Sequence, residues 1–349
     1  MKAFQIDGPG QIHLIETPIP TLKPDETLVR VAYAGLCATD LAILSGDMSL
    51  IRNGSIRYPV RFGHEWSGIV EQVGSAVTQF KPGDRVISET AVACGVCEAC
   101  KNKQWSKCGS IRSLGTIHCW EGAFADYMLM PERHLYHVPD SISMQEAALI
   151  EPSCIALAGI KKLHIGPGKT VLVIGTGAIG LAAVALAKYF GADKVILCGR
   201  KDGKLEVGGT MGADVCVNTT KASMEQTVAV ETGGKGVDVI LETSGNVRLI
   251  PEVLRMAAEG AYIGLIGFYE KEVPSFPIDE IVMKSLNVRG VMGEFGMPGE
   301  LLEILATGKL NLKSLISHVI PFEQTAYVME HADEYAESKI KILAEVAGE

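Results

Sequence analysis

The chain has 349 residues, of which 47% are hydrophobic and 21% charged, and its formal net charge is -9. This length favours two domains over one, each long enough to bury a core. The composition excludes a disordered, collagen-like or coiled-coil chain. The acidic balance argues against nucleic acid as a partner, because a nucleic-acid site needs a positive surface.

The chain contains nine cysteines, and an odd number argues against a fully paired disulfide framework. Residues 1–10 lack the apolar core and cleavage site of a signal peptide, so we expect a cytoplasmic protein with reduced thiols. The uncharged stretch between Lys169 and Lys188 approaches the length of a membrane span. Its three internal glycines favour a buried strand, a turn and a buried helix, so no membrane association is expected.

The first 150 residues predict short strands separated by turns, a pattern typical of a small barrel or sandwich. The expected strands cover residues 28–33, 67–73, 85–87, 124–130 and 135–138. The segment Lys81-Pro82-Gly83-Asp84 predicts a turn between the second and third of them.

After Glu151 the pattern changes, because continuous apolar strands now alternate with helices. The expected strands cover residues 171–174, 194–198, 214–217, 237–241, 261–266 and 287–291. This alternation predicts a doubly wound α/β fold, a parallel sheet covered by helices on both faces. Helices at 299–307 and 322–335 and a strand at 340–346 are expected to follow.

A glycine-rich segment joins the first of these strands to a helix, and it consists of Gly175, Thr176, Gly177, Ala178, Ile179 and Gly180. In this context the spacing indicates a dinucleotide-binding turn. The first glycine makes the turn, the second lets the backbone approach a pyrophosphate, and the third lets helix and strand pack closely. The helix N-terminus then supplies free N–H groups to the phosphates.

The end of the second strand bears on the choice of cofactor. An acidic residue there would bind the ribose of NAD, but this strand ends with Gly199, followed by Arg200 and Lys201. Arg200 offers a planar donor fork suited to a phosphate. The sequence therefore favours NADP(H) over NAD(H), with Gly199, Arg200 and Lys204 as cofactor-binding residues; the alternative is that the basic residues belong to a solvated turn.

Four cysteines, Cys94, Cys97, Cys100 and Cys108, lie within fifteen residues. Four thiolates in one loop can close a tetrahedral shell around zinc and leave no position for substrate, so this zinc would be structural. An iron–sulfur cluster and thiol redox chemistry are the alternatives.

A second constellation is dispersed along the chain and consists of Cys37, His64, Glu65 and Glu151. Each residue alone has an ordinary structural explanation. Beside a dinucleotide turn, however, a thiolate, an imidazole and a carboxylate resemble an open zinc site whose fourth position takes water or substrate.

The order of these motifs resembles the zinc-containing medium-chain dehydrogenase/reductase family, which includes alcohol, sorbitol and threonine dehydrogenases. The resemblance covers essentially the whole chain. It implies a GroES-like β-barrel catalytic domain, residues 1–151 and 292–349, and a Rossmann domain, residues 152–291. It also implies a homodimer or homotetramer, in which a strand near residues 287–291 pairs across an interface.

Taken residue by residue, the resemblance implies that Cys37 and His64 are ligands of the catalytic zinc. Glu65 matches a glutamate that ligates zinc or stands just behind it. Glu151 stands where classical alcohol dehydrogenases have a second cysteine, a feature similar to the sorbitol and threonine dehydrogenase branch. Asp40 matches the carboxylate that orients the histidine ligand, and Thr39 matches the hydroxyl that relays the substrate proton.

One position departs from the family pattern, because Ala42 stands where members often carry the histidine that ends the proton relay. The expected activity is zinc-dependent hydride transfer between NAD(P) and a secondary alcohol such as a polyol, sugar or cyclitol, or its ketone. Candidate pocket residues are Ser45, Thr90, His118, Trp120 and Glu294. The segment 48–61, with Arg52, Asn53, Arg57 and Arg61, is either a polar lid or, with more weight, a solvated loop.

Two other functional classes are alternatives for this sequence. A zinc-free quinone or enone reductase of the same superfamily would have no zinc ligands. A non-enzymatic nucleotide-sensing or zinc-ribbon protein would have a basic surface or an inert first site, and the charge of -9 opposes the nucleic-acid version.

Overall fold

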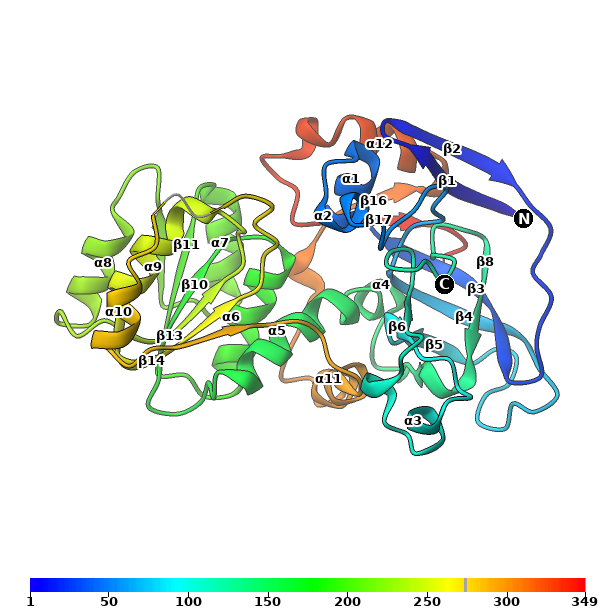
Figure 1. Ribbon diagram of the computed structural model, residues 1–349, viewed down its shortest axis with the longest axis horizontal. Helices are drawn as coiled ribbons and strands as arrows, with labels where there is room; N and C mark the ends of the chain where they lie inside the picture. Colours follow the sequence, from blue (N-terminus) through cyan, green and yellow to red (C-terminus); the bar gives the residue numbers. More distant parts are fainter. Residues whose placement is uncertain (273–274, 349) are drawn as a thin grey trace.

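The computed structural model describes residues 1–272 and 275–348, which form two lobes side by side, each built on its own large sheet (Figure 1). The lobe drawn in green and yellow contains a six-stranded sheet in the order β12-β11-β10-β13-β14-β15, and every pairing in it is parallel. Its strands are β10 (Thr170–Ile174), β11 (Lys194–Gly199), β12 (Val215–Asn218), β13 (Val237–Glu242), β14 (Ala257–Leu265) and β15 (Asn287–Gly290). This order reverses between β10 and β13, which is the place where doubly wound sheets bind nucleotides.

Both faces of this sheet are buried because alternate residues of each strand enter different apolar clusters. Val171 and Val173 of β10 pack with helices on one face, whereas Leu172 and Ile174 pack with helices on the other. The covering helices are α5 (Ile150–Lys162), α6 (Ala178–Tyr189), α7 (Asp202–Thr210), α8 (Met224–Glu231), η3 (Val247–Leu249), α9 (Ile250–Met256) and α10 (Ile278–Met283). The continuous apolar strands predicted from the sequence therefore belong to a sheet covered on both sides.

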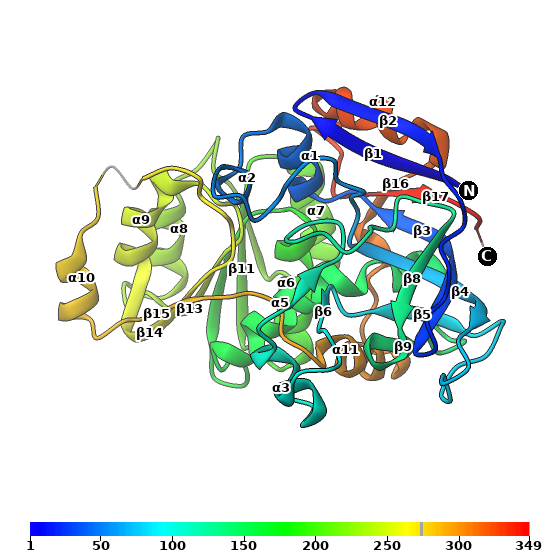
Figure 2. The ribbon, with the colours of Figure 1, turned by 45° about the vertical axis from the view of Figure 1, so that its right-hand side comes forward.

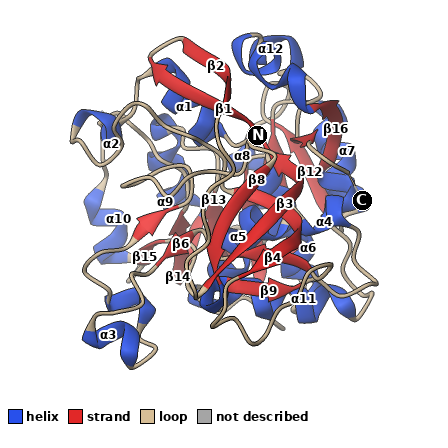
Figure 3. Ribbon diagram, turned by 90° about the vertical axis from the view of Figure 1, so that its right-hand side faces the viewer, coloured by secondary structure: helices blue, strands red, loops and turns tan. Residues whose placement is uncertain are grey.

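The second lobe is built on a sheet in the order β16-β17-β3-β4-β5-β9, with β8 paired to β3 (Figures 2 and 3). Its strands are β3 (Glu26–Gly35), β4 (Glu65–Val73), β5 (Arg85–Ser88), β8 (Tyr127–Pro131), β9 (Leu135–His137), β16 (Ile316–Pro321) and β17 (Lys341–Glu345). The C-terminal strand β17 pairs antiparallel with β3, so segments from both ends of the chain share this sheet.

Smaller elements surround this sheet. The strand pairs are β1 (Lys2–Gly8) with β2 (Gln11–Glu16), and β6 (Ala91–Val92) with β7 (Arg112–Ser113). The α-helices are α1 (Ala38–Ser45), α2 (Ser49–Arg52), α3 (Glu98–Lys101), α4 (Met144–Ala147), α11 (Met297–Ala306) and α12 (Thr325–Glu330). The 3-10 turns are η1 (Trp105–Lys107), η2 (Glu132–His134), η4 (Lys313–Leu315), η5 (Phe322–Gln324) and η6 (Ala332–Tyr335).

The expected α/β class with a barrel-type and a Rossmann-type lobe is confirmed, with local differences. The strand expected from Phe124 begins only at Tyr127, because the Phe124 backbone instead bonds to Phe4 and Phe62. The helix expected over 322–335 is broken into η5, α12 and η6. Within the described residues, no helix is long and apolar enough to cross a membrane, and α6 in the uncharged stretch has only 12 residues.

Candidate active site and metal centres

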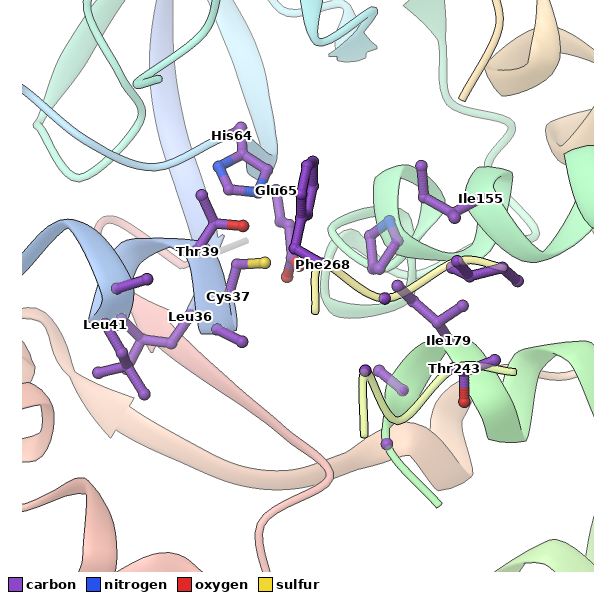
Figure 4. A pocket seen from close by; sticks show the side chains of 18 of the residues that line it. Leu36, Cys37, Thr39, Leu41, His64, Glu65, Ile155, Ile179, Thr243 and Phe268 are labelled. Atoms are coloured by element: carbon purple, nitrogen blue, oxygen red, sulfur yellow. The ribbon is translucent and has the colours of Figure 1, made fainter. Parts of the chain in front are cut away.

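A cavity of about 640 Å³ is lined by residues of both lobes. One end is formed by α1 and the start of β4, and another by the glycine turn before α6. Figure 4 shows Cys37, Thr39, His64 and Glu65 gathered in this cavity, with Phe268, Ile155 and Ile179 nearby. The cavity therefore connects the two groups of residues that the sequence singled out.

Cys37 is the N-cap residue of α1, and this position fixes its backbone. Its N–H donates to Oδ2 of Asp40 at 2.9 Å, a local bond that satisfies one of the free donors at the helix start. Asp40 is fully buried, and its other oxygen, Oδ1, lies 3.7 Å from Nδ1 of His64. Asp40 thus faces both the segment that carries Cys37 and the ring of His64.

Donor atoms of Cys37, His64 and Glu65 all lie within 4.8 Å of one another. His64 and Glu65 are buried, with exposed fractions of 7% and 1%. Burial opposes a charged imidazole, but the negative charges of Cys37 and Asp40 outweigh it and raise the pKa of His64 well above its ordinary value. The neighbouring acidic groups thus favour the charged form of His64 in spite of its burial.

Glu151 lies in the first turn of α5 and lines the same cavity, although it is not part of that close cluster. Its Oε1 accepts a hydrogen bond of 2.9 Å from the hydroxyl of Thr90. Burial raises the pKa of Glu151, whereas the charge of His64 lowers it, so the two side chains interact electrostatically. The structure brings the four predicted residues to one cavity, three of them into direct proximity.

Lys341 is a functional candidate that the sequence did not identify. Its buried ammonium donates to Oε1 of Glu65 at 2.6 Å and to the carbonyl of Leu36 at 3.0 Å. Burial works against the charged lysine, yet the charges of Glu65 and Cys37 raise its pKa. The only available signal was a lysine directly before the apolar residues Ile342, Leu343 and Ala344.

These donors fit a catalytic zinc ion. Thiolate, imidazole and carboxylate are the ligand types that Zn²⁺ takes, and a site with three protein ligands keeps a position open for substrate. Nδ1 of His64 lies 3.7 Å from Oδ1 of Asp40 and has no hydrogen-bond partner among the described residues. With Nδ1 facing this carboxylate, Nε2 is the ring nitrogen that would bind a metal. A divalent cation would compensate the negative charge buried here.

The four-cysteine segment forms a second cluster, well suited to a structural zinc. The sulfurs of Cys94, Cys97, Cys100 and Cys108 lie within 4.8 Å of one another. Backbone N–H groups of Val96 and Cys97 lower the pKa of Cys94 and favour its thiolate. The cluster has only a small apolar core of its own, so a metal would stabilise much of this lobe.

The glycine turn has the local geometry expected of a dinucleotide site. Gly175 adopts φ +116, a conformation that favours glycine. A Cβ on Gly180 would lie 2.0 Å from the carbonyl oxygen of Gly175, so the third glycine permits the close approach of helix and turn. A Cβ on Gly177 would meet no protein atom within 4 Å, and Gly177 to Gly180 line the cavity. The space in front of Gly177 is therefore free for a ligand.

Matches to known proteins agree with this geometry. Residues 23–140 match the model of the alcohol dehydrogenase GroES-like domain, and residues 178–307 match that of the zinc-binding dehydrogenase domain. A sorbitol dehydrogenase from Bacillus subtilis is 32% identical over 343 residues, which cover 98% of this chain and 96% of that protein. The chain belongs to the zinc-containing medium-chain dehydrogenase/reductase family.

Two solved structures of related dehydrogenases carry nicotinamide cofactors. A zinc-binding dehydrogenase from Sinorhizobium meliloti bound to NADP is 29% identical, with a TM-score of 0.88 over 99% of this chain and 98% of that one. An Escherichia coli alcohol dehydrogenase complexed with NADH is 28% identical, with the same TM-score over 99% of both chains. This chain is thus a zinc-dependent dehydrogenase that exchanges hydride between an alcohol and a nicotinamide cofactor, and both alternative functional classes are set aside.

In this dehydrogenase the remaining predicted cofactor residues lie around the second strand. Gly199 ends β11, and a Cβ there would lie 2.4 Å from Cγ2 of Thr176. Arg200 is exposed beyond the strand, whereas Lys204 lines the cavity and donates to the carbonyl of Ala336 at 3.0 Å. Gly175, Thr176, Gly199 and Arg200 do not line the cavity itself.

Two loops at the carboxyl ends of β13 and β14 also line the cavity, although no sequence motif marks them. Buried Glu242 orders both loops, because it accepts bonds from the N–H groups of Ser244 and Gly245 and from the hydroxyl of Tyr269. The neighbouring Phe268 projects toward the metal donors (Figure 4). The signal for these loops was their position after parallel strands, where ligands bind.

Of the five pocket candidates from the sequence, only Thr90 lines the cavity. Trp120 instead donates to the carbonyl of Leu129 and stacks against Arg112, and Glu294 pairs with Lys162. The N–H of His118 donates to the carbonyl of Ser55, and the hydroxyl of Ser45 donates to the carbonyl of Ala42.

The polar side chains of residues 48–61, for which the sequence favoured a solvated loop over a lid, are engaged outside the cavity. Arg52 pairs with Asp47 and Glu270, and Arg61 pairs with Glu121. Arg57 and Asn53 bond to neighbouring backbone atoms. From the same segment, only the apolar Met48 and Leu50 line the cavity.

Proposed function

We propose that the enzyme interconverts a secondary alcohol and its ketone with NADP(H), at a zinc ion held by Cys37 and His64. Glu65 and Glu151 are the carboxylates that complete this zinc site, and the one that is bound changes during turnover. The observation that carries the proposal is the close cluster of Cys37, His64 and Glu65 in the cavity that also reaches Gly177. A second zinc is assigned to Cys94, Cys97, Cys100 and Cys108.

When bound, the zinc ion would supply Lewis acidity at the alcohol oxygen, and NADP⁺ would accept the hydride that the alcohol loses together with one proton on becoming a ketone. The chain's own residues hold and orient the reactants. Asp40 faces the ring of His64 at 3.7 Å and favours its charged form, and Lys341 holds Glu65 while neutralising part of its charge. Gly177 and the start of α6 offer backbone N–H groups to the cofactor phosphates.

Thr39 is proposed to accept and pass on the substrate proton. Thr39 lines the cavity from the first turn of α1, two residues after Cys37. Ala42 has no group that can continue this relay, and it lines the same cavity. The proton therefore passes from Thr39 to water in the cavity or through a ribose hydroxyl of the cofactor.

The preference for NADP(H) rests on charge around the end of β11. Arg200 has no ion-pair partner among the described residues, and Lys201 and Lys204 follow it. The strand end carries no carboxylate that would repel a 2′-phosphate, because Gly199 stands there. Lys201 is paired with Glu337, so Arg200 is the best candidate for direct phosphate contact.

The assignment of the catalytic zinc is tested with Cys37→Ser. Wild-type protein should bind two zinc ions per chain, one for each donor cluster, and oxidise secondary alcohols, with activity followed through the absorbance of the reduced nicotinamide. We expect Cys37→Ser to keep the zinc of the four-cysteine cluster and to lose alcohol oxidation. Full activity of this variant after zinc is restored would contradict the assignment.

The domain boundaries and the oligomeric state are also proposals. We divide the chain into a catalytic domain of residues 1–151 and 292–349 and a cofactor domain of residues 152–291, supported by the pairing of β17 with β3. The edge strand β15 is exposed, and Ile278, Val282 and Met283 beside it have exposed fractions of 60%, 72% and 70%. An unpaired edge flanked by apolar residues favours a homodimer in which β15 pairs with its copy.

A further inference from the structure

The two lobes meet on two sides of the cavity, and only one of these sides is joined by the chain itself. The chain crosses between the lobes at α5 and again after β15, where it leads to α11. There α5 packs against α11, and Nζ of Lys161 lies 2.5 Å from Oε2 of Glu300. Nearer the upper edge of the molecule, α2 of the catalytic lobe faces the cofactor lobe (Figures 1 and 2). On that side the lobes depend on side-chain contacts.

Glu270 makes such a contact from the loop that follows β14, and it lines the cavity. Its Oε2 accepts hydrogen bonds of 2.8 Å from the N–H of Ser49 and from the guanidinium of Arg52, and its Oε1 accepts one of 2.9 Å from the Ser49 hydroxyl. Asp47 orients Arg52 through a bond of 3.0 Å. We call the bonds of Glu270 with Ser49 and Arg52 the interlobe contact.

The interlobe contact is ionic and accessible to water. Burial opposes the charged carboxylate, but the bonds from Ser49 and the charge of Arg52 lower the pKa of Glu270, so the group is ionised at neutral pH. The side chains of Arg52 and Glu270 have exposed fractions of 52% and 23%. Ion pairs this exposed are weak and are screened by salt. The contact can therefore break while both lobes stay folded.

The backbone of Glu270 depends on the same bonds. Its φ of +54 is a left-handed conformation that residues other than glycine rarely adopt. Such a conformation costs free energy and persists where surrounding contacts compensate for it. The bonds to Ser49 and Arg52 are contacts of this kind, so the loop and α2 hold each other in position.

Residues on both sides of the interlobe contact form part of the cavity wall. Met48 and Leu50 flank Ser49 and line the cavity from the catalytic lobe, and Phe268 lines it two residues before Glu270. Because Glu270 binds both the N–H and the hydroxyl of Ser49, it fixes the backbone between the two lining residues of α2. The position of this wall therefore depends on a carboxylate of the other lobe.

We propose that Glu270 is a positioning residue for the dehydrogenase reaction, because the interlobe contact holds the wall of Met48 and Leu50 over the bound alcohol. This inference rests on the proposed function, which places the alcohol at the metal donors of the same cavity. Glu270 acts through α2 and touches no reacting atom. The KM for the alcohol thus depends on an exposed ion pair between the lobes, whereas kcat, which is set at the metal donors and the nicotinamide, does not.

Hydrogen–deuterium exchange of the zinc-loaded full chain, without cofactor or alcohol, tests the wall directly. Glu270→Gln and Arg52→Gln each remove one charge of the interlobe contact. Either variant should speed exchange of peptide 48–54, whose N–H groups bond within α2, about two- to fivefold. Glu300→Gln removes an ion pair between α5 and α11 and should leave this peptide unchanged. Unchanged exchange in both variants of the contact, or equal acceleration in Glu300→Gln, would overturn the proposal.

Steady-state kinetics at saturating NADP tests the consequence, with butan-2-ol, butane-2,3-diol and xylitol as probe alcohols. Glu270→Gln and Arg52→Gln should each raise KM for the alcohol about two- to fivefold and keep kcat within about twofold. The double variant should raise KM no further than either single one, since both changes act through one contact. Additive increases, or the KM of wild type in both single variants, would overturn the proposal. Melting temperature and zinc content establish that each variant is folded.

Salt separates the ion pair from a general loosening of the loop. Addition of about 0.5 M NaCl should raise the KM of wild type toward that of Glu270→Gln and leave the KM of Glu270→Gln nearly constant. A KM of wild type that is independent of salt would overturn the proposal. If no probe alcohol is oxidised by protein that carries both zinc ions, the proposed function fails, and the exchange rates of peptide 48–54 still decide whether Glu270 holds the wall.

Discussion

Gly177 and Gly180 belong to the same turn, but Gly177 leaves space for a ligand, whereas Gly180 packs against the turn itself. Alanine substitution separates these two roles. Gly177 has φ -81 and ψ 178, which alanine adopts without strain, and an added Cβ meets no protein atom within 4 Å. Gly177→Ala should therefore change the free energy of unfolding by no more than about 1 kcal/mol. Its methyl group instead occupies the space through which a pyrophosphate reaches the backbone N–H groups.

Loss of one charge-assisted hydrogen bond to a phosphate corresponds to about 1.5–3 kcal/mol. Gly177→Ala should accordingly weaken NADPH binding by about 10- to 100-fold. Gly180→Ala acts on the protein itself, because the new Cβ would lie 2.0 Å from the Gly175 oxygen and 2.9 Å from Oγ1 of Thr243. Overpacking of this kind costs about 1–3 kcal/mol of stability.

The two variants are compared by urea denaturation without cofactor and by titration with NADPH, followed through its fluorescence. The expected pattern is a stable Gly177→Ala with weak binding and a destabilised Gly180→Ala. Equal destabilisation of both variants would refute the assignment of cofactor binding to Gly177 and of packing to Gly180. Wild-type affinity of Gly177→Ala for NADPH would refute the placement of the pyrophosphate at this turn.

Three further predictions concern the lobes and the cofactor. Cys100→Ser should reduce the zinc content from two ions per chain to one and make the four-cysteine segment sensitive to limited proteolysis, because the metal stabilises that segment; unchanged zinc content would contradict this. Arg200→Ala should lower kcat/KM for NADPH about tenfold or more and that for NADH by less than about threefold, since only NADPH has the 2′-phosphate; an equal loss for both would contradict it. Burial raises the pKa of Glu89, although bonds from the Tyr136 hydroxyl and the Gly296 N–H oppose this, so the folded state holds the proton more tightly than the unfolded chain. Its stabilising contribution is therefore lost as the pH rises above 4.5 through the folded-state pKa. Glu89→Gln keeps the Oε1 that accepts both bonds and cannot ionise, and urea denaturation at pH 5, 6.5 and 8 should show the variant gaining stability relative to wild type with rising pH; a difference independent of pH would contradict this.

Local patterns allowed much of the fold and the donor groups to be predicted. The apolar strands of the cofactor lobe are visible because both faces of a parallel sheet are buried. The four cysteines and the glycine turn are contiguous in sequence, so their spacing alone brings their atoms together. The cavity wall was not predictable in this way, and His118 and Trp120 show why: both follow a cavity-lining segment in sequence, yet their bonds direct them to other backbone atoms.

Strand register explains why the central contact of the active site was invisible in the sequence. Gly35 of β3 pairs with Glu65 of β4 on one side and with Leu343 of β17 on the other. A Cβ on Gly35 would lie 2.5 Å from Oε2 of Glu65, so the carboxylate lies over this glycine and reaches Lys341, which is 276 residues away in sequence. Cys37 follows Gly35 by two residues, and His64 precedes Glu65 directly. The pairing of three strands at one glycine therefore sets the positions of the thiolate, the imidazole, the carboxylate and the lysine together, and any side chain at position 35 would displace the Glu65 carboxylate from this arrangement.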